Sequence, residues 1–413
     1  MLAIFLILVL IVISTFLLTQ KFNLPRNVSL LFLLQPLVMC SAPIIVFIGG
    51  LLSTQLTNNA SFATLPISLM ILGVATGSIP AAMIAKAKGR KFAILTGFSC
   101  LLIAALLAIT ATKLALFNCF VLASFLFGIG GAFTQQLRFV AIESTKNEED
   151  TPKVLAILML SGVFAAFLGP EVAVSAKDWL DSPHGYAGSF ALLAAFIGLA
   201  ALIMVFFEEP QIKEVKNSGD ARPLSVIVKQ PIFLIAICTA TIGYALMSFI
   251  MTATPVHMHV HEAYSLQETK WVIQSHILAM FLPSLFSGHL ANKLGIKPLM
   301  FLGLVLYAAC IGLSLSGRDV MHYWGGLVLL GLGWNFLFVS GTLLLASTYQ
   351  ENERFKAQGF HDFFVFGSQA CASLSSGAII YSLGWDVLVL LALPFVILQV
   401  LVMIFGFKGS AIH

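Results

Sequence analysis

Charged residues are scarce in this chain. Only 10% of its 413 residues are Asp, Glu, Lys or Arg, whereas 59% are hydrophobic. Soluble domains average about 25% charged residues, so no soluble fold has enough interior to bury these apolar side chains. In lipid, only helices and closed barrels satisfy the backbone hydrogen bonds. The apolar runs are roughly 20 residues long, which is the length of a helix that crosses the bilayer, and they predict an all-α integral membrane protein.

The chain also lacks the motifs of several other protein classes. Its six cysteines are widely separated inside apolar runs, with no disulfide framework or zinc spacing. It contains no Gly-x-x-x-x-Gly-Lys-Ser/Thr loop, and neither a His-Glu-x-x-His nor a Gly-x-Ser-x-Gly motif. The formal net charge of +4 is small and does not indicate a nucleic-acid partner. We therefore expect no ATP drive, no cofactor and no enzymatic activity.

Twelve apolar spans can be recognised from the hydrophobic runs. They are 28–50, 62–85, 92–112, 115–137, 153–176, 187–207, 231–256, 270–292, 298–316, 322–347, 356–382 and 385–407. A further apolar run, 2–20, lacks the basic start and the cleavage site of a signal peptide. Two interpretations of this run stay open: an extra N-terminal helix, or a start codon that is placed too early.

The basic residues predict how the spans are oriented. If the turn at 86–91 is cytoplasmic, all but four of the 22 Lys and Arg residues lie on the cytoplasmic side. This asymmetry is typical of membrane proteins and places the C-terminus in the cytoplasm. The four exceptions are Lys113, Lys177, Lys270 and Arg318.

The sequence repeats itself at about half its length. Gly89 and Gly295 each lie in a short basic turn that follows an apolar span. Two other pairs of segments recur in the same order, namely 39–43 with 251–255 and 128–133 with 331–336. An internal repeat of this kind indicates a duplicated membrane module. The predicted parts are an extra hydrophobic segment at 1–27, a six-helix half at 28–208, a cytoplasmic linker at 209–230 and a second half at 231–413.

This arrangement resembles the major facilitator superfamily. The family's turn reads roughly Gly-x-Leu-Ala-Asp-Arg-x-Gly-Arg-Lys, and it follows spans two and eight. The matching residues here are Gly89, Arg90 and Lys91 in the first copy, and Gly288, Leu290, Ala291, Lys293, Gly295 and Lys297 in the second. The family's aspartate is replaced by Lys86 and by Asn292, so the acid that pairs with a neighbouring helix is missing. The resemblance implies a monomeric secondary transporter in the lipid bilayer, whose two halves expose a central site to each side in turn.

A narrower resemblance concerns the cargo. Segments 167–170, 187–190, 251–255 and 273–284 are similar to a bacterial subgroup that includes riboflavin importers. The resemblance implies uptake of riboflavin or a similar heterocycle across the bacterial inner membrane. A siderophore or a drug-like compound is the alternative cargo, and an intramembrane enzyme or a sensor without transport is the alternative class.

Polar residues inside the spans are candidates for contact with the substrate, because burying them in lipid is costly. Amide and imidazole groups both donate and accept hydrogen bonds, which suits a neutral heterocycle. Bonding between helices is the alternative for the whole set, and snorkelling to the cytoplasmic interface is the alternative for its arginine. The candidates are Gln35, Gln135, Gln136, Arg138, Tyr244, Gln274, His276, Trp334 and Asn335.

Titratable residues in the spans are candidates for two other roles. Glu171, His361 and Asp362 are proton-coupling candidates, because burial of a carboxylate favours its protonated form; a position among the headgroups is the alternative. The segment 257–261 carries three histidines at alternate positions, His257, His259 and His261. They would suit Zn or Cu in an extended chain, but on a helix only the first and third share a face, and no metal is predicted.

Overall fold

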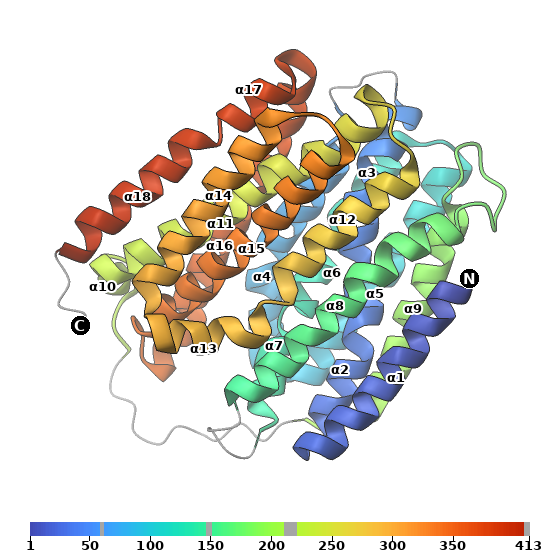
Figure 1. Cartoon of the computed structure of the whole chain (residues 1–413). Helices are drawn as coiled ribbons and strands as arrows, with labels where there is room; N and C mark the ends of the chain where they lie inside the picture. Colours follow the sequence, from blue (N-terminus) through green and yellow to red (C-terminus); the bar gives the residue numbers. More distant parts are fainter. Residues whose placement is uncertain (58–61, 146–150, 210–220, 409–413) are drawn as a thin grey trace. The chain divides into compact units, whose positions relative to one another are not determined.

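The computed structural model describes residues 1–57, 62–145, 151–209 and 221–408, and these residues contain helices but no strand (Figure 1). Twelve of the described segments are long and apolar enough to cross a membrane. The prediction of an all-α membrane protein is confirmed. The twelve differ from the predicted set in two places, because they include Leu2–Phe22 and leave out the region of the predicted span 270–292.

The chain divides into two compact units, Met1–Ile212 and Lys213–His413. The helices of unit 1 are α1 (Leu2–Phe22), α2 (Arg26–Met39), α3 (Ser41–Leu56), α4 (Leu65–Lys88), α5 (Arg90–Lys113), α6 (Phe117–Thr134), α7 (Leu137–Glu143), α8 (Thr151–Ser175) and α9 (Ala187–Val205).

The first apolar run forms a helix of its own. In α1, Ile4 and Ile11 are buried, whereas most of the other apolar side chains are exposed. The hydroxyls of Thr19 and Ser29 lie 2.7 Å apart and join α1 to α2. The segment is therefore a helix of spanning length that packs along one narrow face.

Unit 2 contains α10 (Leu224–Ile227), α11 (Pro231–Val256), the π-helix η3 (His257–His261), α12 (Leu266–Phe281), α13 (Ser284–Leu294), α14 (Ile296–Ser316), α15 (Val320–Ala346), the 3₁₀-helix η4 (Glu351–Glu353), α16 (Arg354–Ser382), α17 (Gly384–Leu390) and α18 (Leu393–Lys408).

Three spans predicted as continuous helices are interrupted. The span 28–50 is divided between α2 and α3 at Cys40, and the span 385–407 between α17 and α18. The prediction of one helix over 270–292 is wrong, because α12 ends at Phe281 and α13 begins at Ser284. Proline explains the break between α12 and α13, since Pro283 has no N–H to donate to the carbonyl four residues earlier.

The internal repeat reappears as matching contacts between helices. In unit 1, a Cβ atom on Gly130 of α6 would lie 2.9 Å from the carbonyl oxygen of Gly97 on α5. In unit 2, a Cβ atom on Gly333 of α15 would lie 2.9 Å from the carbonyl oxygen of Gly303 on α14. Both pairs allow backbone to meet backbone, as is common between membrane helices. Each unit thus contains the same close helix crossing.

Candidate functional site

Five aromatic side chains from four helices pack together in unit 2, and we call them the aromatic cluster: Tyr244 of α11, Phe281 of α12, Trp334 and Phe338 of α15, and Phe366 of α16. The rings of Trp334 and Phe338 are stacked, with centroids 5.0 Å apart and an interplanar angle of 7°. The rings of Tyr244 and Trp334 are nearly perpendicular, at 82°, with centroids 5.1 Å apart. Edge-to-face and offset stacks are the favourable arrangements of aromatic rings.

The structure thus brings together two predicted residues, Tyr244 and Trp334, and adds three phenylalanines that sequence reasoning missed. The chain contains 35 phenylalanines, so residue type alone could not single out these three. The spacing of four between Trp334 and Phe338 places them on one helix face, and it could have indicated that Phe338 lies beside Trp334.

His276 and Asn335 link α12 to α15 inside unit 2. His276 Nδ1 lies 2.7 Å from the carbonyl oxygen of Leu327, and Asn335 Nδ2 donates to the carbonyl oxygen of Met280 at 2.7 Å. Asn335 Nδ2 also donates to Ser284 Oγ at 2.6 Å. Both side chains are fully buried. One polar atom of each residue therefore serves helix packing, which is the alternative role that the sequence left open.

Each of these residues, and Trp334 as well, also keeps a polar atom that has no hydrogen-bond partner among the described residues: His276 Nε2, Asn335 Oδ1 and Trp334 Nε1. A carbonyl can only accept, so the neutral His276 ring carries its proton on Nδ1 and leaves Nε2 as an acceptor. The set therefore offers two acceptors and one indole N–H donor. Buried polar atoms without partners are costly, which makes each of these three atoms a candidate contact for a bound ligand.

The other candidates for contact with the substrate are scattered. Gln274 is half-buried on α12, on a different side of the helix from His276. In unit 1, Gln35 is buried and its Nε2 donates to the carbonyl oxygen of Leu158 at 3.4 Å. Gln135 is exposed, and the guanidinium of Arg138 lies 4.7 Å from the ring centroid of Phe139.

The basic turn of unit 1 is held by an acid from a distant part of the chain. Gly89 joins α4 to α5 with a φ of 88°, a conformation that favours glycine. The carboxylate of Glu209 accepts hydrogen bonds from the backbone N–H groups of Arg90 and Lys91, the latter at 2.9 Å. Lys91 Nζ donates to the carbonyl oxygens of Val205 and Phe207, each at 2.8 Å.

A second acid binds the side chain of Arg90. The guanidinium donates to both carboxylate oxygens of Glu143 on α7, at 2.5 and 2.8 Å, and to the amide oxygen of Gln136 at 2.8 Å. Arg90 is buried and Glu143 nearly so. The turn has lost the family's aspartate, yet Glu143 and Glu209 supply carboxylates to it. The structure also places Gln136, predicted to contact the substrate, within this network.

The equivalent turn of unit 2 has the same backbone. Gly295 joins α13 to α14 with a φ of 90°. Lys297 Nζ lies 4.5 Å from the ring centroid of Phe407 on α18. Gly288 and Asn292 lie on α13, where their surroundings are outside the described part of the structure.

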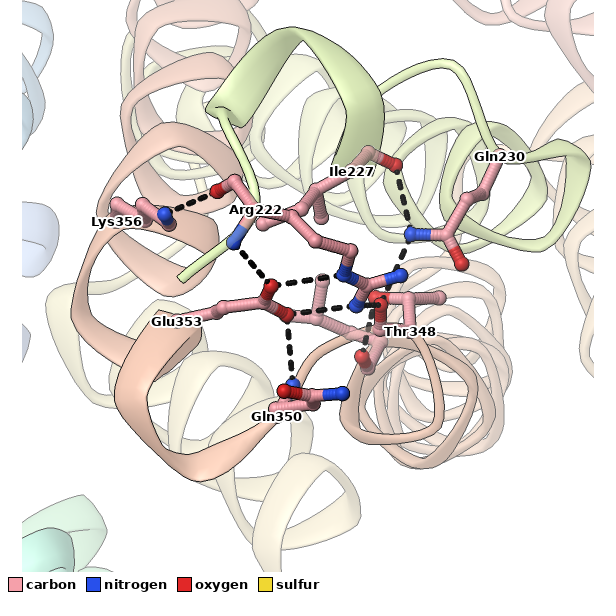
Figure 2. A network of polar contacts seen from close by, with 8 residues as sticks. Arg222, Ile227, Gln230, Thr348, Gln350, Glu353 and Lys356 are labelled. Carbon is pink, nitrogen blue, oxygen red and sulfur yellow. Dashed lines mark hydrogen bonds and ion pairs between the residues drawn. The ribbon is translucent and has the colours of Figure 1, made fainter. Parts of the chain in front are cut away.

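The end of the predicted linker 209–230 is bound to unit 2, although residues 210–220 lie outside the described part (Figure 2). The buried carboxylate of Glu353 accepts from the backbone N–H of Arg222 at 2.8 Å and from its guanidinium at 2.7 and 2.6 Å. Lys356 Nζ donates to the carbonyl oxygen of Arg222. Gln230 Nε2 donates to the carbonyl oxygen of Thr348 at 2.9 Å. We call this group the linker anchor.

The linker anchor predicts a pH dependence of stability. Hydrogen bonds from Arg222, together with the backbone N–H of Gln350, lower the pKa of Glu353 from 4.5 to about 2. A depressed carboxyl pKa stabilises the fold above pH 4.5, and this contribution is lost as the pH falls toward 2. We expect Glu353→Gln to lower the unfolding temperature by a constant amount between pH 7 and 5.5. The difference from the parent should shrink below about pH 4.5, and a difference that grows on acidification would contradict the assignment.

The proton-coupling candidates lie in two places. Glu171 of α8 is half-buried and accepts a hydrogen bond from Ser175 Oγ at 2.7 Å. His361 and Asp362, near the start of α16, are joined through His361 Nδ1 and Asp362 Oδ1 at 3.0 Å. Glu171 belongs to unit 1, and His361 and Asp362 belong to unit 2.

The three histidines after Pro255 do not converge on one point. They form the π-helix η3, where the rings of His257 and His261 lie 5.5 Å apart. His259 Nδ1 lies 2.7 Å from the carbonyl oxygen of Tyr264. In the described part of the chain, no group of three or more His, Cys, Asp or Glu residues is placed to hold a metal ion.

Comparison with known proteins identifies the family. The sequence profile described as "Major Facilitator Superfamily" matches residues 30–267 and 238–410. The "Riboflavin transporter RfnT" of Brucella anthropi is 35% identical over 386 residues, which cover 93% of this chain and 96% of that protein. The "Uncharacterized MFS-type transporter YddS" of Bacillus subtilis is 28% identical over 378 residues, 85% of this chain and 86% of that one.

Solved structures agree on the fold. A bacterial homologue of the iron transporter ferroportin, in an outward-facing state, has a TM-score of 0.67 and 13% identity, covering 93% of this chain and all of that one. The human organic anion transporter MFSD10 has a TM-score of 0.69 and 13% identity, covering 92% and 99%. Identities this low show the fold alone. With the profile and the 35% identical relative, they lead to one conclusion: the chain belongs to the major facilitator superfamily and is a secondary transporter.

Proposed function

We propose that this transporter takes up riboflavin or a similar flat heterocycle, and that its path lies in a bacterial inner membrane with the C-terminus in the cytoplasm. The observation that carries the proposal is the 35% identity to a riboflavin transporter over 93% of this chain. Proton coupling through Glu171, His361 or Asp362 and a monomeric state belong to the same proposal.

The chemistry of the aromatic cluster supports a flat, polar cargo. A fused ring system stacks on aromatic side chains, and Tyr244, Trp334 and Phe338 come from two neighbouring helices. The riboflavin ring system carries carbonyl oxygens that accept and an imide N–H that donates. Trp334 Nε1 is a donor, and His276 Nε2 and Asn335 Oδ1 are acceptors. These groups are of the kinds that can pair with the acceptors and the donor of the riboflavin ring system. Gln35, Gln135, Arg138 and Gln274 are proposed as further contacts.

Binding to the purified protein tests the cargo. We expect riboflavin fluorescence to be quenched on binding, and a ligand at 100 times its Kd to stabilise the protein by about 2.7 kcal/mol. Trp334→Ala should weaken binding about 2- to 12-fold, equivalent to the ~0.5–1.5 kcal/mol of an aromatic pair. Trp334→Phe keeps a ring and removes the N–H, so it separates stacking from hydrogen bonding.

Trp271→Phe is the matched control, because Trp271 is 42% exposed and stacks on Trp324 at 5.6 Å, away from the cluster. The control should bind riboflavin as the parent does. Stabilisation by a siderophore or a drug-like compound, with no response to riboflavin, would replace the proposed cargo. Saturable uptake into proteoliposomes then checks that binding leads to transport.

A further inference from the structure

A buried histidine outside the proposed substrate site joins three elements of unit 2. His257 opens η3, and its ring centroid lies 4.9 Å from that of Trp385 on α17. Its Nδ1 lies 2.9 Å from the hydroxyl of Tyr323 on α15. All three side chains are buried. The contacts of this one imidazole therefore connect the end of α11 to α15 and α17.

The backbone that carries His257 is weakly held. Pro255 lacks an N–H group, so the last turn of α11 is short of one hydrogen bond. The chain then continues as a π-helix, in which the N–H of Glu262 donates to the carbonyl oxygen of His257 at 3.0 Å. π-Helical turns are rare and occur often at functional sites. The position of η3 thus depends strongly on side-chain contacts such as those of His257.

The same imidazole has a route to solvent. The ring of His261 is nearly parallel to that of His257, at 5.5 Å, and His261 is exposed. Glu262 Oε1 lies 3.9 Å from His257 Nε2, and the Glu262 side chain is 33% exposed. A proton from solution can therefore reach His257 Nε2 past the exposed His261 and the partly exposed Glu262.

The charges around His257 decide what a proton does there. Arg318 and Asp386, which form an ion pair with each other, are both close enough to act on the charge of His257. Tyr323 faces it from α15, and Tyr381 of α16 packs against His261 at 5.5 Å. A second proton would put a positive charge in a buried aromatic site beside a guanidinium. Glu262, at 3.9 Å from Nε2, is partly exposed, so solvent screens its attraction, and Asp386 is already paired with Arg318. The charge on the buried ring therefore remains costly.

We propose that His257 is a proton-binding site whose protonation loosens the packing of η3 against α15 and α17. The neutral ring keeps one N–H, a proton from solution adds to the free nitrogen, and the same proton leaves when packing is restored. In the proposed orientation this end of unit 2 faces the outside, so the external pH would set the state of the site. The inference does not depend on riboflavin being the cargo.

The test uses Trp385 as the reporter. The other four tryptophans are replaced by phenylalanine, namely Trp179, Trp271, Trp324 and Trp334. Emission of the purified protein is titrated from pH 7.5 to 3, a range that extends well below the ordinary imidazole pKa of about 6.5 because a buried charge is costly. We expect emission to fall on acidification, because a protonated imidazole quenches a neighbouring indole. Quenching by added acrylamide should rise over the same range, because the packing loosens.

Two variants and one control make the outcome decisive. His257→Gln and His257→Asn should both abolish the titration, and a thermal unfolding measurement identifies a variant that does not fold. His322→Gln is the control, since His322 lies next to Tyr323 but is partly exposed and faces Asp319; its titration should match the parent. An unchanged titration in the His257 variants, or a flat response in the parent, would overturn the proposal. No substrate is present, so failure here leaves the proposed cargo untouched.

Discussion

Replacing Glu143 with alanine is expected to destabilise unit 1 by about 3–5 kcal/mol, the usual cost of removing one partner of a buried ion pair. Arg90 is only 4% exposed and donates two hydrogen bonds to the Glu143 carboxylate. Without Glu143, the buried guanidinium loses the carboxylate that accepts two of its hydrogen bonds and keeps the amide oxygen of Gln136, a neutral acceptor. The unfolding midpoint in detergent, followed by circular dichroism, measures the loss.

An exposed ion pair in the same unit provides the comparison. Arg26 and Glu208 are joined at 2.9 Å, with side chains 62% and 76% exposed. Glu208→Ala should cost less than about 1 kcal/mol, as for other surface pairs. The double variant Arg90→Ala with Glu143→Ala should lose less than the sum of its single changes, because both remove one interaction. Equal losses for Glu143→Ala and Glu208→Ala would show that burial of the pair contributes nothing.

This ion pair also shows where sequence reasoning stopped. The turn itself was predictable, since Gly89 and Gly295 both adopt a positive φ at the two places where the motif recurs. Its partners were not, because Glu143 and Glu209 lie 53 and 119 residues from Arg90 along the chain. The missing aspartate predicted a turn without the acid that pairs with a neighbouring helix. Folding instead brings acids from α7 and from the segment just after α9, the last helix of the unit.

The helical architecture followed from composition, because lipid leaves few alternatives for so apolar a chain. Hydropathy could not show the break before Ser284, since Leu282 and Pro283 are both apolar and only the missing N–H of proline interrupts the helix. Among the candidate site residues, Tyr244 and Trp334 meet across neighbouring helices. Whether a polar side chain forms a hydrogen bond to a neighbouring helix or to a substrate depends on its rotamer, which the sequence does not specify. His276, for example, contacts a backbone carbonyl through Nδ1, while its Nε2 has no hydrogen-bond partner among the described residues.

Gly128→Ala is expected to destabilise unit 1 by about 3 kcal/mol, at the upper end of the usual cost of overpacking. A Cβ atom at Gly128 on α6 would collide with the carbonyl oxygen of Met70 on α4. The obstacle is backbone, so no side-chain rotation relieves it and the two helices must separate. In the repeat, a Cβ atom on Gly331 would lie 2.7 Å from the carbonyl oxygen of His276, so Gly331→Ala should have the same effect in unit 2.

The same substitution elsewhere in unit 1 separates this contact from a general effect of alanine. Among the described atoms, a Cβ atom on Gly198 of α9 would meet nothing within 4 Å. Gly198→Ala should therefore be neutral or stabilise by up to about 1 kcal/mol, through the higher helix propensity of alanine. Unfolding midpoints of the two variants, measured side by side, decide the matter. If Gly128→Ala matched Gly198→Ala, α4 and α6 would be able to separate at no cost, and close backbone contact would not be what fixes this crossing.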